Sequence, residues 1–151
     1  MNPKLIEWAK RYIPAEIISI TATILSSVFS YKLTQSYLTT ALVGTWVGNI
    51  FYFGTILGVD IYNTHTDLAK KNKKYSFKTF GRNIRALVVE FGFSEVFDSF
   101  LIRPTLMYYF PIWVNEIWLG IFLAKIVADI TFYVPAIVAY EYSKKKLRNF
   151  E

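Results

Sequence analysis

The sequence contains no cysteine and a single histidine, His65, among its 151 residues. Without cysteine there is no disulfide or thiolate metal site, and one histidine is too few for a histidine-based metal centre. The chain also lacks a glycine-rich phosphate loop, a GxSxG turn and an HExxH helix. We therefore expect a protein that is not an enzyme and that holds no metal or cofactor.

Charged residues are also scarce, at 19% of the chain, whereas hydrophobic residues reach 54% and aromatic residues 19%. Soluble proteins carry about 25% charged residues. A water-soluble domain of this length has too little interior to cover so much apolar surface. Tyrosine and tryptophan, for example Trp8, Tyr31 and Trp118, lie near the ends of the apolar runs, as in the aromatic belts of membrane proteins. The composition predicts an integral membrane protein whose main partner is the lipid bilayer.

The apolar runs predict one all-α membrane domain, residues 1–151, with four transmembrane helices. The expected spans cover 14–31, 37–61, 86–110 and 114–140. Each approaches or exceeds the length needed to cross a hydrocarbon core of about 30 Å. Pro14 suits the first helical position of the first span, where its missing N–H costs nothing. The spans would form two tandem hairpins.

The basic residues predict the orientation of these hairpins. Of the lysines and arginines between spans, only Lys32 lies in the two short connections. The others lie in the N-terminal segment, the 62–85 connector and the tail: Lys4, Lys10, Arg11, Lys70, Lys71, Lys73, Lys74, Lys78, Arg82, Arg85, Lys144, Lys145, Lys146 and Arg148. This bias places both termini and the connector in the cytoplasm, in a multi-pass protein of the cell membrane. We attribute the basic runs to membrane anchoring and expect no nucleic-acid partner.

The second and fourth spans resemble each other, which predicts an internal repeat. Gly44, Gly48 and Asn49 of span two correspond, eighty residues later, to Ala124, Ala128 and Asp129 of span four. Two hairpins of the same orientation would form a parallel repeat. In spans one and three, Ala15-Glu16-Ile17 resembles Ser94-Glu95-Val96, but a second register pairs Arg11 and Glu16 with Arg85 and Glu90, and the sequence leaves both open.

The small residues of this pattern, Gly44, Gly48, Ala124 and Ala128, are expected to allow close helix packing. Within a four-span chain we expect spans two and four to pack against each other through them. The alternative is that they form the interface of a homo-oligomer.

Several ionisable residues lie inside the apolar runs, where each costs at least about 2.5–3.5 kcal/mol unless it is paired. We predict one buried polar cluster in which Asn49 of span two faces spans three and four, with these members: Glu90, Glu95, Asp98, Arg103, Lys125 and Asp129. An antiparallel hairpin turning near Pro111 would bring Asp98 level with Lys125 and Glu95 level with Asp129. Pro104 is expected to kink span three and to free the carbonyl of Phe100.

The layout resembles the GtrA-like family of small four-helix membrane proteins, which are also two tandem hairpins with a basic connector. The resemblance rests on Arg11-Tyr12 and Arg82-Asn83-Ile84-Arg85 at the starts of the two halves, and on Asn49-Ile50-Phe51 and Asp129-Ile130-Thr131-Phe132 further along. The family's later Asn-Arg pair is absent here, and span three is more acidic. The resemblance implies a role in moving or presenting polyprenyl-linked sugars across the membrane.

Two functions follow from the cluster. The first is a non-enzymatic membrane protein that transports or presents a polar or lipid-linked substrate through the charged side chains, since ionisable residues in membranes often mark substrate pathways. The second is an accessory or structural subunit of a larger membrane complex, in which the cluster fixes helix packing or meets another membrane subunit.

Overall fold

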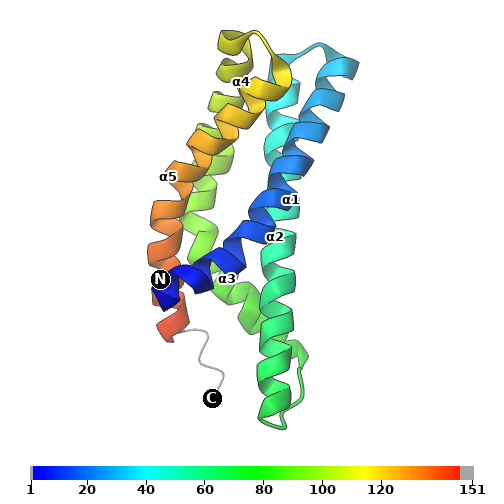
Figure 1. Cartoon of the computed structure of the whole chain (residues 1–151). Helices are drawn as coiled ribbons and strands as arrows, with labels where there is room; N and C mark the ends of the chain where they lie inside the picture. The colour runs from blue at the N-terminus through cyan, green and yellow to red at the C-terminus, as the bar shows by residue number, and fades with distance from the viewer. Residues whose placement is uncertain (1, 147–151) are drawn as a thin grey trace.

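In a computed structural model of the chain, the described part folds into four long helical passages arranged as two hairpins (Figure 1). The structure describes residues 2–146, with side chains up to 142. Three passages are single helices: α1 (Pro3–Thr34), α2 (Tyr37–Lys70) and α5 (Ile117–Lys146). The remaining passage joins α3 (Phe77–Phe97), a π-helix η1 (Asp98–Ile102) and α4 (Arg103–Val114). The all-α prediction is confirmed.

Three helices are long and apolar enough to cross a membrane: α1, α2 and the part of α5 up to Tyr142. The third passage does not form one continuous α-helix, because η1 interrupts it. The expected span over 86–110, for which a kink at Pro104 was predicted, therefore consists of three consecutive segments. Together they cover the same residues and extend beyond them at both ends.

The start of the first span was predicted wrongly, because α1 begins at Pro3 and contains Pro14 in its interior. The side chain of Asn2 caps the helix by accepting a hydrogen bond from the N–H of Lys4 at 3.1 Å, and Pro3 occupies the favourable first position. Consequently the segment with the first basic residues is helical, and Arg11 is buried on it.

The predicted connector 62–85 is also too long, since α2 continues to Lys70 and α3 starts at Phe77. The actual connection is residues 71–76. The N–H of Lys73 donates to the carbonyl of Leu68 at 2.8 Å and closes the end of α2. Ser76 caps α3 through its hydroxyl, which accepts from the N–H of Thr79. Hydrogen bonds of this kind determine where a helix begins or ends, and the hydropathy of the sequence does not show them.

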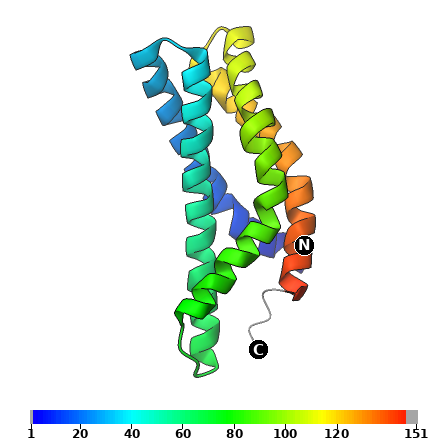
Figure 2. The ribbon, with the colours of Figure 1, turned by 180° about the vertical axis from the view of Figure 1, so that it is seen from behind.

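The turn of the second hairpin lies at Asn115, not near Pro111 as predicted. Asn115 has φ 60°, a left-handed conformation that asparagine tolerates, whereas Pro111 lies buried inside α4. Figures 1 and 2 show this turn and the 35–36 turn at one end of the molecule and the 71–76 connection at the other, with the start of α1 in the half that contains the connection but well short of its end. The predicted basic residues of the tail (Lys144, Lys145, Lys146 and Arg148) have side chains outside the described residues.

The glycines of α2 pack against α1, which corrects the expectation that spans two and four meet through them. A side chain at Gly48 would collide with Thr23 of α1, and one at Gly44 would collide with Ser27. The hydroxyl of Ser19 donates to the carbonyl of Gly48 at 3.0 Å. Small and hydroxyl-bearing residues therefore let the two helices of this hairpin approach closely.

The second hairpin has its own close approach, which the sequence pattern did not single out. A Cβ at Gly120 of α5 would collide with the backbone of Phe110 and Pro111 in α4. Ala124 is fully buried beside Met107 of α4 and Ile121, and Ala128 is also fully buried.

We expect Gly120→Ala to destabilise the protein strongly, by about 2 kcal/mol or more, because a backbone in its path cannot rotate away as a side chain could. The matched control is Gly54→Ala, since a Cβ at Gly54 meets nothing within 4 Å. Denaturant unfolding of both variants in the same detergent, followed by tryptophan fluorescence, checks the difference. Equal midpoints would show that α4 and α5 do not approach at Gly120.

The buried positions of α2 recur in α5 eighty residues later. In α2 from residue 40 to 60 they are Thr40, Ala41, Gly44, Thr45, Gly48, Asn49, Tyr52, Ile56 and Asp60. In α5 they are Gly120, Ile121, Ala124, Lys125, Ala128, Asp129, Phe132, Ala136 and Tyr140. The two helices thus present the same face to the interior, position by position.

The first and third passages correspond in the same way, with a shift of one residue at η1. Arg11, Tyr12, Ala15 and Ser19 of α1 are buried, and so are the residues seventy-nine positions later: Glu90, Phe91, Ser94 and Asp98. Beyond η1 the separation is eighty, from Thr23 to Arg103 and from Ser27 to Met107. A π-helix accommodates one extra residue in a helix, which explains the shift.

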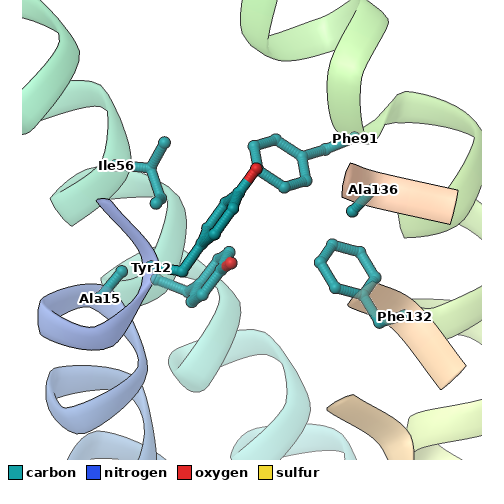
Figure 3. Packing of buried hydrophobic residues seen from close by; sticks show 7 residues of the cluster. Tyr12, Ala15, Ile56, Phe91, Phe132 and Ala136 are labelled. Atoms are coloured by element: carbon teal, nitrogen blue, oxygen red, sulfur yellow. The ribbon is translucent and has the colours of Figure 1, made fainter. Parts of the chain in front are cut away.

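Corresponding residues also meet in the apolar core (Figure 3). The rings of Tyr12 and Phe91 lie 6.4 Å apart, and those of Tyr52 and Phe132 lie 6.2 Å apart. Phe91 and Phe132 stack at 5.7 Å. All four passages therefore contribute to one aromatic cluster, which lies between the two polar clusters described next.

Candidate functional site: two buried charge clusters

The π-helix η1 carries the third passage's polar residues into the interior. Its turn is closed by a hydrogen bond from the N–H of Arg103 to the carbonyl of Asp98. Asp98 and Ser99 are adjacent in sequence and both buried. A kink was predicted at Pro104, and the structure has a π-turn shortly before that residue; π-turns are common at functional sites.

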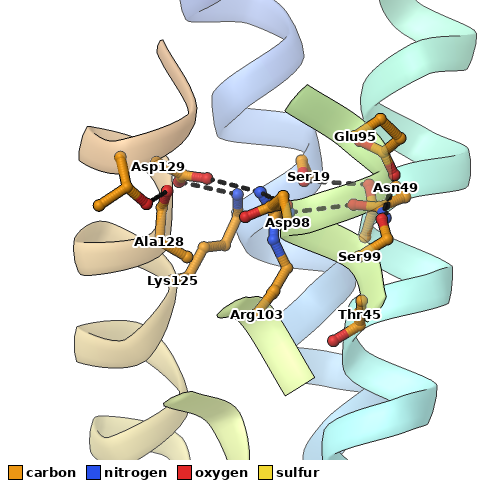
Figure 4. Close-up of polar contacts among 12 residues, drawn as sticks. Ser19, Thr45, Asn49, Glu95, Asp98, Ser99, Arg103, Lys125, Ala128 and Asp129 are labelled. Carbon is orange, nitrogen blue, oxygen red and sulfur yellow. Dashed lines mark hydrogen bonds and ion pairs between the residues drawn. The ribbon is translucent and has the colours of Figure 1, made fainter. Parts of the chain in front are cut away.

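Arg103 is the centre of the first cluster and joins three helical passages (Figure 4). Its Nη1 donates to Oδ1 of Asn49 on α2, and its Nη2 donates to Oδ1 of Asp129 on α5, both at 3.0 Å. The same Nη2 lies 2.8 Å from Oδ2 of Asp98. Its Nε is buried without a hydrogen-bond partner. The guanidinium therefore holds α2, η1 and α5 in fixed register.

Lys125 is the second cation of this cluster and is 1% exposed. Its Nζ lies 2.9 Å from Oδ2 of Asp129 and 2.8 Å from Oε1 of Glu16 on α1. The hydroxyl of Tyr133 donates to the other oxygen of Glu16. The predicted pair Lys125–Asp129 is present, whereas the closest carboxylate of another helix is Glu16 and not the expected Asp98.

Glu95 lies at the opposite side of the cluster and has no cation within 4 Å among the described side chains. Its Oε1 accepts a hydrogen bond from Nδ2 of Asn49 at 2.7 Å and another from the hydroxyl of Ser99. Its side chain is only partly buried. The sequence prediction placed Glu95 level with Asp129, but its direct partner is Asn49.

The first cluster contains more negative than positive side chains. Its carboxylates are Glu16, Glu95, Asp98 and Asp129, and its cations are Arg103 and Lys125. With all six ionised it carries two uncompensated negative charges. Buried charges without compensation are costly, so this cluster favours protons or cations over anions.

Glu90 does not belong to this cluster, which corrects the prediction. It lies two helical turns before Asp98 on α3 and binds Arg11 of α1 through a hydrogen bond of 2.9 Å and a second, shorter one. Arg11 also binds Asp60 of α2 in a bidentate pair, at 3.0 and 2.9 Å. The hydroxyl of Tyr12 donates to Glu90 at 2.7 Å. This second cluster ties α1, α2 and α3 together.

Three charged residues of the clusters were not predicted as members, namely Arg11, Asp60 and Glu16. Arg11 was assigned to the N-terminal segment before the first span, because the first helix was expected to begin at Pro14, and Asp60 was not singled out within the second span. Glu16 could have been found through the repeat, since it corresponds to Glu95 in the Ala15-Glu16-Ile17 register. Within the described residues, no group of three or more acidic, histidine or cysteine side chains could hold a metal ion.

A recess opens beside the first cluster between α2, α3 and α5. Polar and aromatic side chains line it: Asn49, Tyr52, Phe53, Glu95, Arg103, Asp129 and Phe132. Tyr52 is 5% exposed, and its hydroxyl has no hydrogen-bond partner. As the side chains stand, the recess leaves no space for a separate water-sized group.

Comparisons with family models, with curated proteins and with solved structures find no match for this chain. The function therefore has to be argued from the two clusters and the recess.

Proposed function

We propose that the protein is a four-span protein of the cell membrane, with both termini in the cytoplasm, that binds and moves a polar or lipid-linked substrate through the first cluster. The observation that carries this proposal is the group of six ionisable side chains, with unequal numbers of acids and bases, inside the helical bundle. Three of them, Glu16, Lys125 and Asp129, lie on helices that are long and apolar enough to cross a membrane. Charges at such depth are expensive in lipid and are associated with substrate or ion pathways.

The outer surface of the helices supports a lipid environment. Large apolar side chains are exposed on every passage, for example Phe29, Ile50, Phe93 and Val138. In water such a surface would favour aggregation, whereas acyl chains solvate it. The basic 71–76 connection forms one end of the molecule and the start of α1 lies in the same half, as expected for the cytoplasmic side.

The matching burial patterns support the parallel internal repeat as part of this proposal. They favour the register that relates Glu16 to Glu95, because the alternative would pair buried Arg11 with exposed Arg85. Two equivalent hairpins that enclose a site at mid-depth are a common architecture of membrane transporters.

The resemblance to GtrA-like proteins suggests a polyprenyl-linked sugar as the substrate. The acidic excess limits how such a molecule binds, because carboxylates repel a phosphate. The group that enters the cluster would be the hydroxyl-rich or cationic head of the lipid, and the phosphate would lie near the basic end of the bundle.

The test is lipid flipping in proteoliposomes, with a fluorescently labelled polyprenyl phosphoryl hexose as the probe and dithionite quenching as the readout. We expect Asp98→Asn to abolish flipping while the helical signal in circular dichroism stays unchanged, because Asn keeps the shape of Asp and removes only the charge that faces Arg103. The matched control is Asp67→Asn, on the exposed surface of α2, which should flip as the parent does.

An accessory role in a larger membrane complex is the competing proposal, and the closed network around Arg11 favours it. If Asp98→Asn flips the probe normally, or if the parent itself does not flip it and a partner co-purifies from mild detergent, the accessory role replaces transport. Loss of the partner in Asp98→Asn would then assign the cluster to assembly.

A further inference from the structure

Two interfaces of the fold hold a glutamate at corresponding positions, but only one of them supplies a cation to it. At the α1–α5 interface, Glu16 lies 2.8 Å from the ammonium of Lys125 and accepts a hydrogen bond from Tyr133. At the α2–α3 interface, Glu95 accepts hydrogen bonds from the amide of Asn49 and the hydroxyl of Ser99. Both of these donors are neutral, so the charge of Glu95 lacks the compensation that Glu16 has.

The residues that correspond to Lys125 and Tyr133 account for this difference. Eighty positions earlier in the sequence stand Thr45 and Phe53. The hydroxyl of Thr45 lies 3.6 Å from the sulfur of Met107, and Phe53 has no hydroxyl. The α2–α3 interface therefore keeps the carboxylate but has neither the ammonium nor the phenol.

The ionisable groups around Glu95 leave no positive charge for it. Neighbouring elements present one phenol, two carboxylates and one guanidinium: Tyr52 of α2, Asp98 of η1, Asp129 of α5 and Arg103 of α4. The Nη2 atom of Arg103 lies within 3.0 Å of both Asp98 and Asp129. Its Nη1 donates to Asn49, so Glu95 is linked to the guanidinium only through a neutral amide.

The packing around Glu95 excludes a separate cation but not a proton. The recess beside it leaves no space for a water-sized group, so an ion or an amine of that size or larger has no place there. A proton needs no such space. Both hydrogen bonds described above go to Oε1 of Glu95, and Oε2 can therefore hold a proton without displacing either donor.

The position of Glu95 near the lipid-facing surface also favours a neutral carboxyl group. Its side chain is partly exposed, and the nearby Phe93 and Val96 are 77% and 57% exposed. Ile50, next to Asn49 on α2, is 68% exposed. In a membrane these apolar residues face acyl chains, where an ionised carboxylate without a cation is costly and a protonated carboxyl group is much less so.

We propose that Glu95 is a proton-binding site, which carries a proton on Oε2 at rest and exchanges it when the substrate moves. The proton lowers the uncompensated negative charge of the first cluster from two to one, which reduces the cost of burying it. This inference rests on the proposed function and names the ion that is coupled to it. For each substrate molecule moved, Glu95 would take up one proton from one side of the membrane and release it to the other.

Infrared spectroscopy of the purified protein at neutral pH detects this proton directly. A protonated carboxyl group has a carbonyl stretch that a carboxylate lacks, and the band shifts in deuterated water. We expect the band in the parent, its loss in Glu95→Gln and its persistence in Glu116→Gln, whose side chain is exposed. A parent without the band, or an unchanged band in Glu95→Gln, overturns the proposal.

The stability of Glu95→Gln gives a second measurement on the same variant. Glutamine has the shape and the neutral charge of a protonated glutamate, so we expect the variant to unfold at the same denaturant concentration as the parent at neutral pH. Failure of Glu95→Gln to fold would mean that the position requires an ionised carboxylate, which contradicts the proposal.

Thr45→Lys tests the comparison of the two interfaces without changing Glu95. Its lysine stands on α2 where Lys125 stands on α5, so we expect the new ammonium to compensate Glu95 and the infrared band to disappear. A folded Thr45→Lys protein that keeps the full band would show that Glu95 is not the protonated group. If the variant does not fold, the Glu95→Gln spectra decide.

Flipping of the polyprenyl phosphoryl hexose probe in a pH gradient tests the coupling. If one proton accompanies each probe molecule, a pH difference of about one unit at zero membrane potential changes the steady-state ratio of the probe between the leaflets about tenfold. An ionophore that collapses the gradient should restore an equal distribution, and Glu95→Gln should show no response to the gradient.

The results separate a failure of this inference from a failure of the proposed function. A parent that flips the probe but ignores the gradient overturns the coupling and leaves transport standing. A parent that does not flip the probe overturns the proposed function, and the infrared band then decides on the proton at Glu95 by itself.

Discussion

Arg11→Met is expected to prevent stable folding or to lower the free energy of unfolding by about 3–5 kcal/mol. Arg11 is 5% exposed and binds Asp60 and Glu90, which are themselves buried. Removing one partner of a buried ionic network leaves the other charges uncompensated, and this costs far more than the hydrogen bonds alone would suggest. In this case two buried carboxylates would lose the guanidinium that binds both of them.

The aromatic surroundings of Arg11 add to the effect. Its guanidinium carbon lies 4.4 Å from the ring centre of Tyr140 on α5 and 5.3 Å from that of Tyr12. Methionine keeps much of the volume but removes the cation–π attraction and every hydrogen bond that Arg11 donates. The loss should appear as a lower yield of monodisperse protein and a lower melting temperature in detergent.

Lys10→Met is the matched control, because Lys10 is the adjacent residue and is exposed. It removes the same formal charge from the same segment, so any effect of net charge on membrane insertion is shared by both variants. We expect its stability to stay within about 0.5 kcal/mol of the parent. Similar losses in both variants would mean that insertion, and not the Arg11 network, limits the yield.

The sequence predicted the number and order of the helical passages well, because the signal is the length of the apolar runs. The sequence did not predict correctly where these helices begin and end. Arg11 was placed in the segment before the first span, but α1 already begins at Pro3, and α2 continues to Lys70, beyond the expected end of the second span at residue 61. Helix ends depend on caps such as Asn2 and Ser76, whose contribution is a single hydrogen bond each and which hydropathy does not register.

The composition of the first cluster was mostly correct, whereas its pairing was not. Asn49, Arg103, Lys125 and Asp129 do meet, because helical spacing and the hairpin arrangement bring them to one depth. Glu90 was included because it shares a broad face with Asp98 on a helical wheel. A helical wheel shows which residues share a face but not how far apart they lie along the helix axis. Glu90 lies two turns away from Asp98, which is far enough for it to bind a different partner.

The π-helix could not be predicted from periodicity. Pro104 indicated a break, but a proline can be accommodated by a kink, by bound water or by a π-turn. The spacing between corresponding residues of the internal repeat marks the position of the π-helix. The separation between corresponding residues changes from seventy-nine to eighty between Asp98 and Arg103, which marks one extra residue in that passage.

Lys125→Met is the second change with a large expected effect, about 3 kcal/mol or more in the free energy of unfolding. Lys125 is 1% exposed and lies within 3 Å of both Glu16 and Asp129. Without its ammonium, those carboxylates are buried together, and the uncompensated charge of the first cluster rises from two to three. Methionine fills the space of the lysine stem, so lost packing contributes little.

The other interface of the fold suggests how the loss can be reversed. There, Thr45 and Asn49 stand where Lys125 and Asp129 stand in α5, and Glu95 accepts a hydrogen bond from the Asn49 amide without any lysine. Lys125→Thr combined with Asp129→Asn copies this neutral pair into α5 and removes one charge of each sign. We expect the double variant to unfold at a higher denaturant concentration than Lys125→Met, even though it departs from the parent at two buried positions. A double variant less stable than Lys125→Met would show that the two interfaces are not equivalent, because the amide introduced at position 129 would then have failed to hold Glu16 as Asn49 holds Glu95.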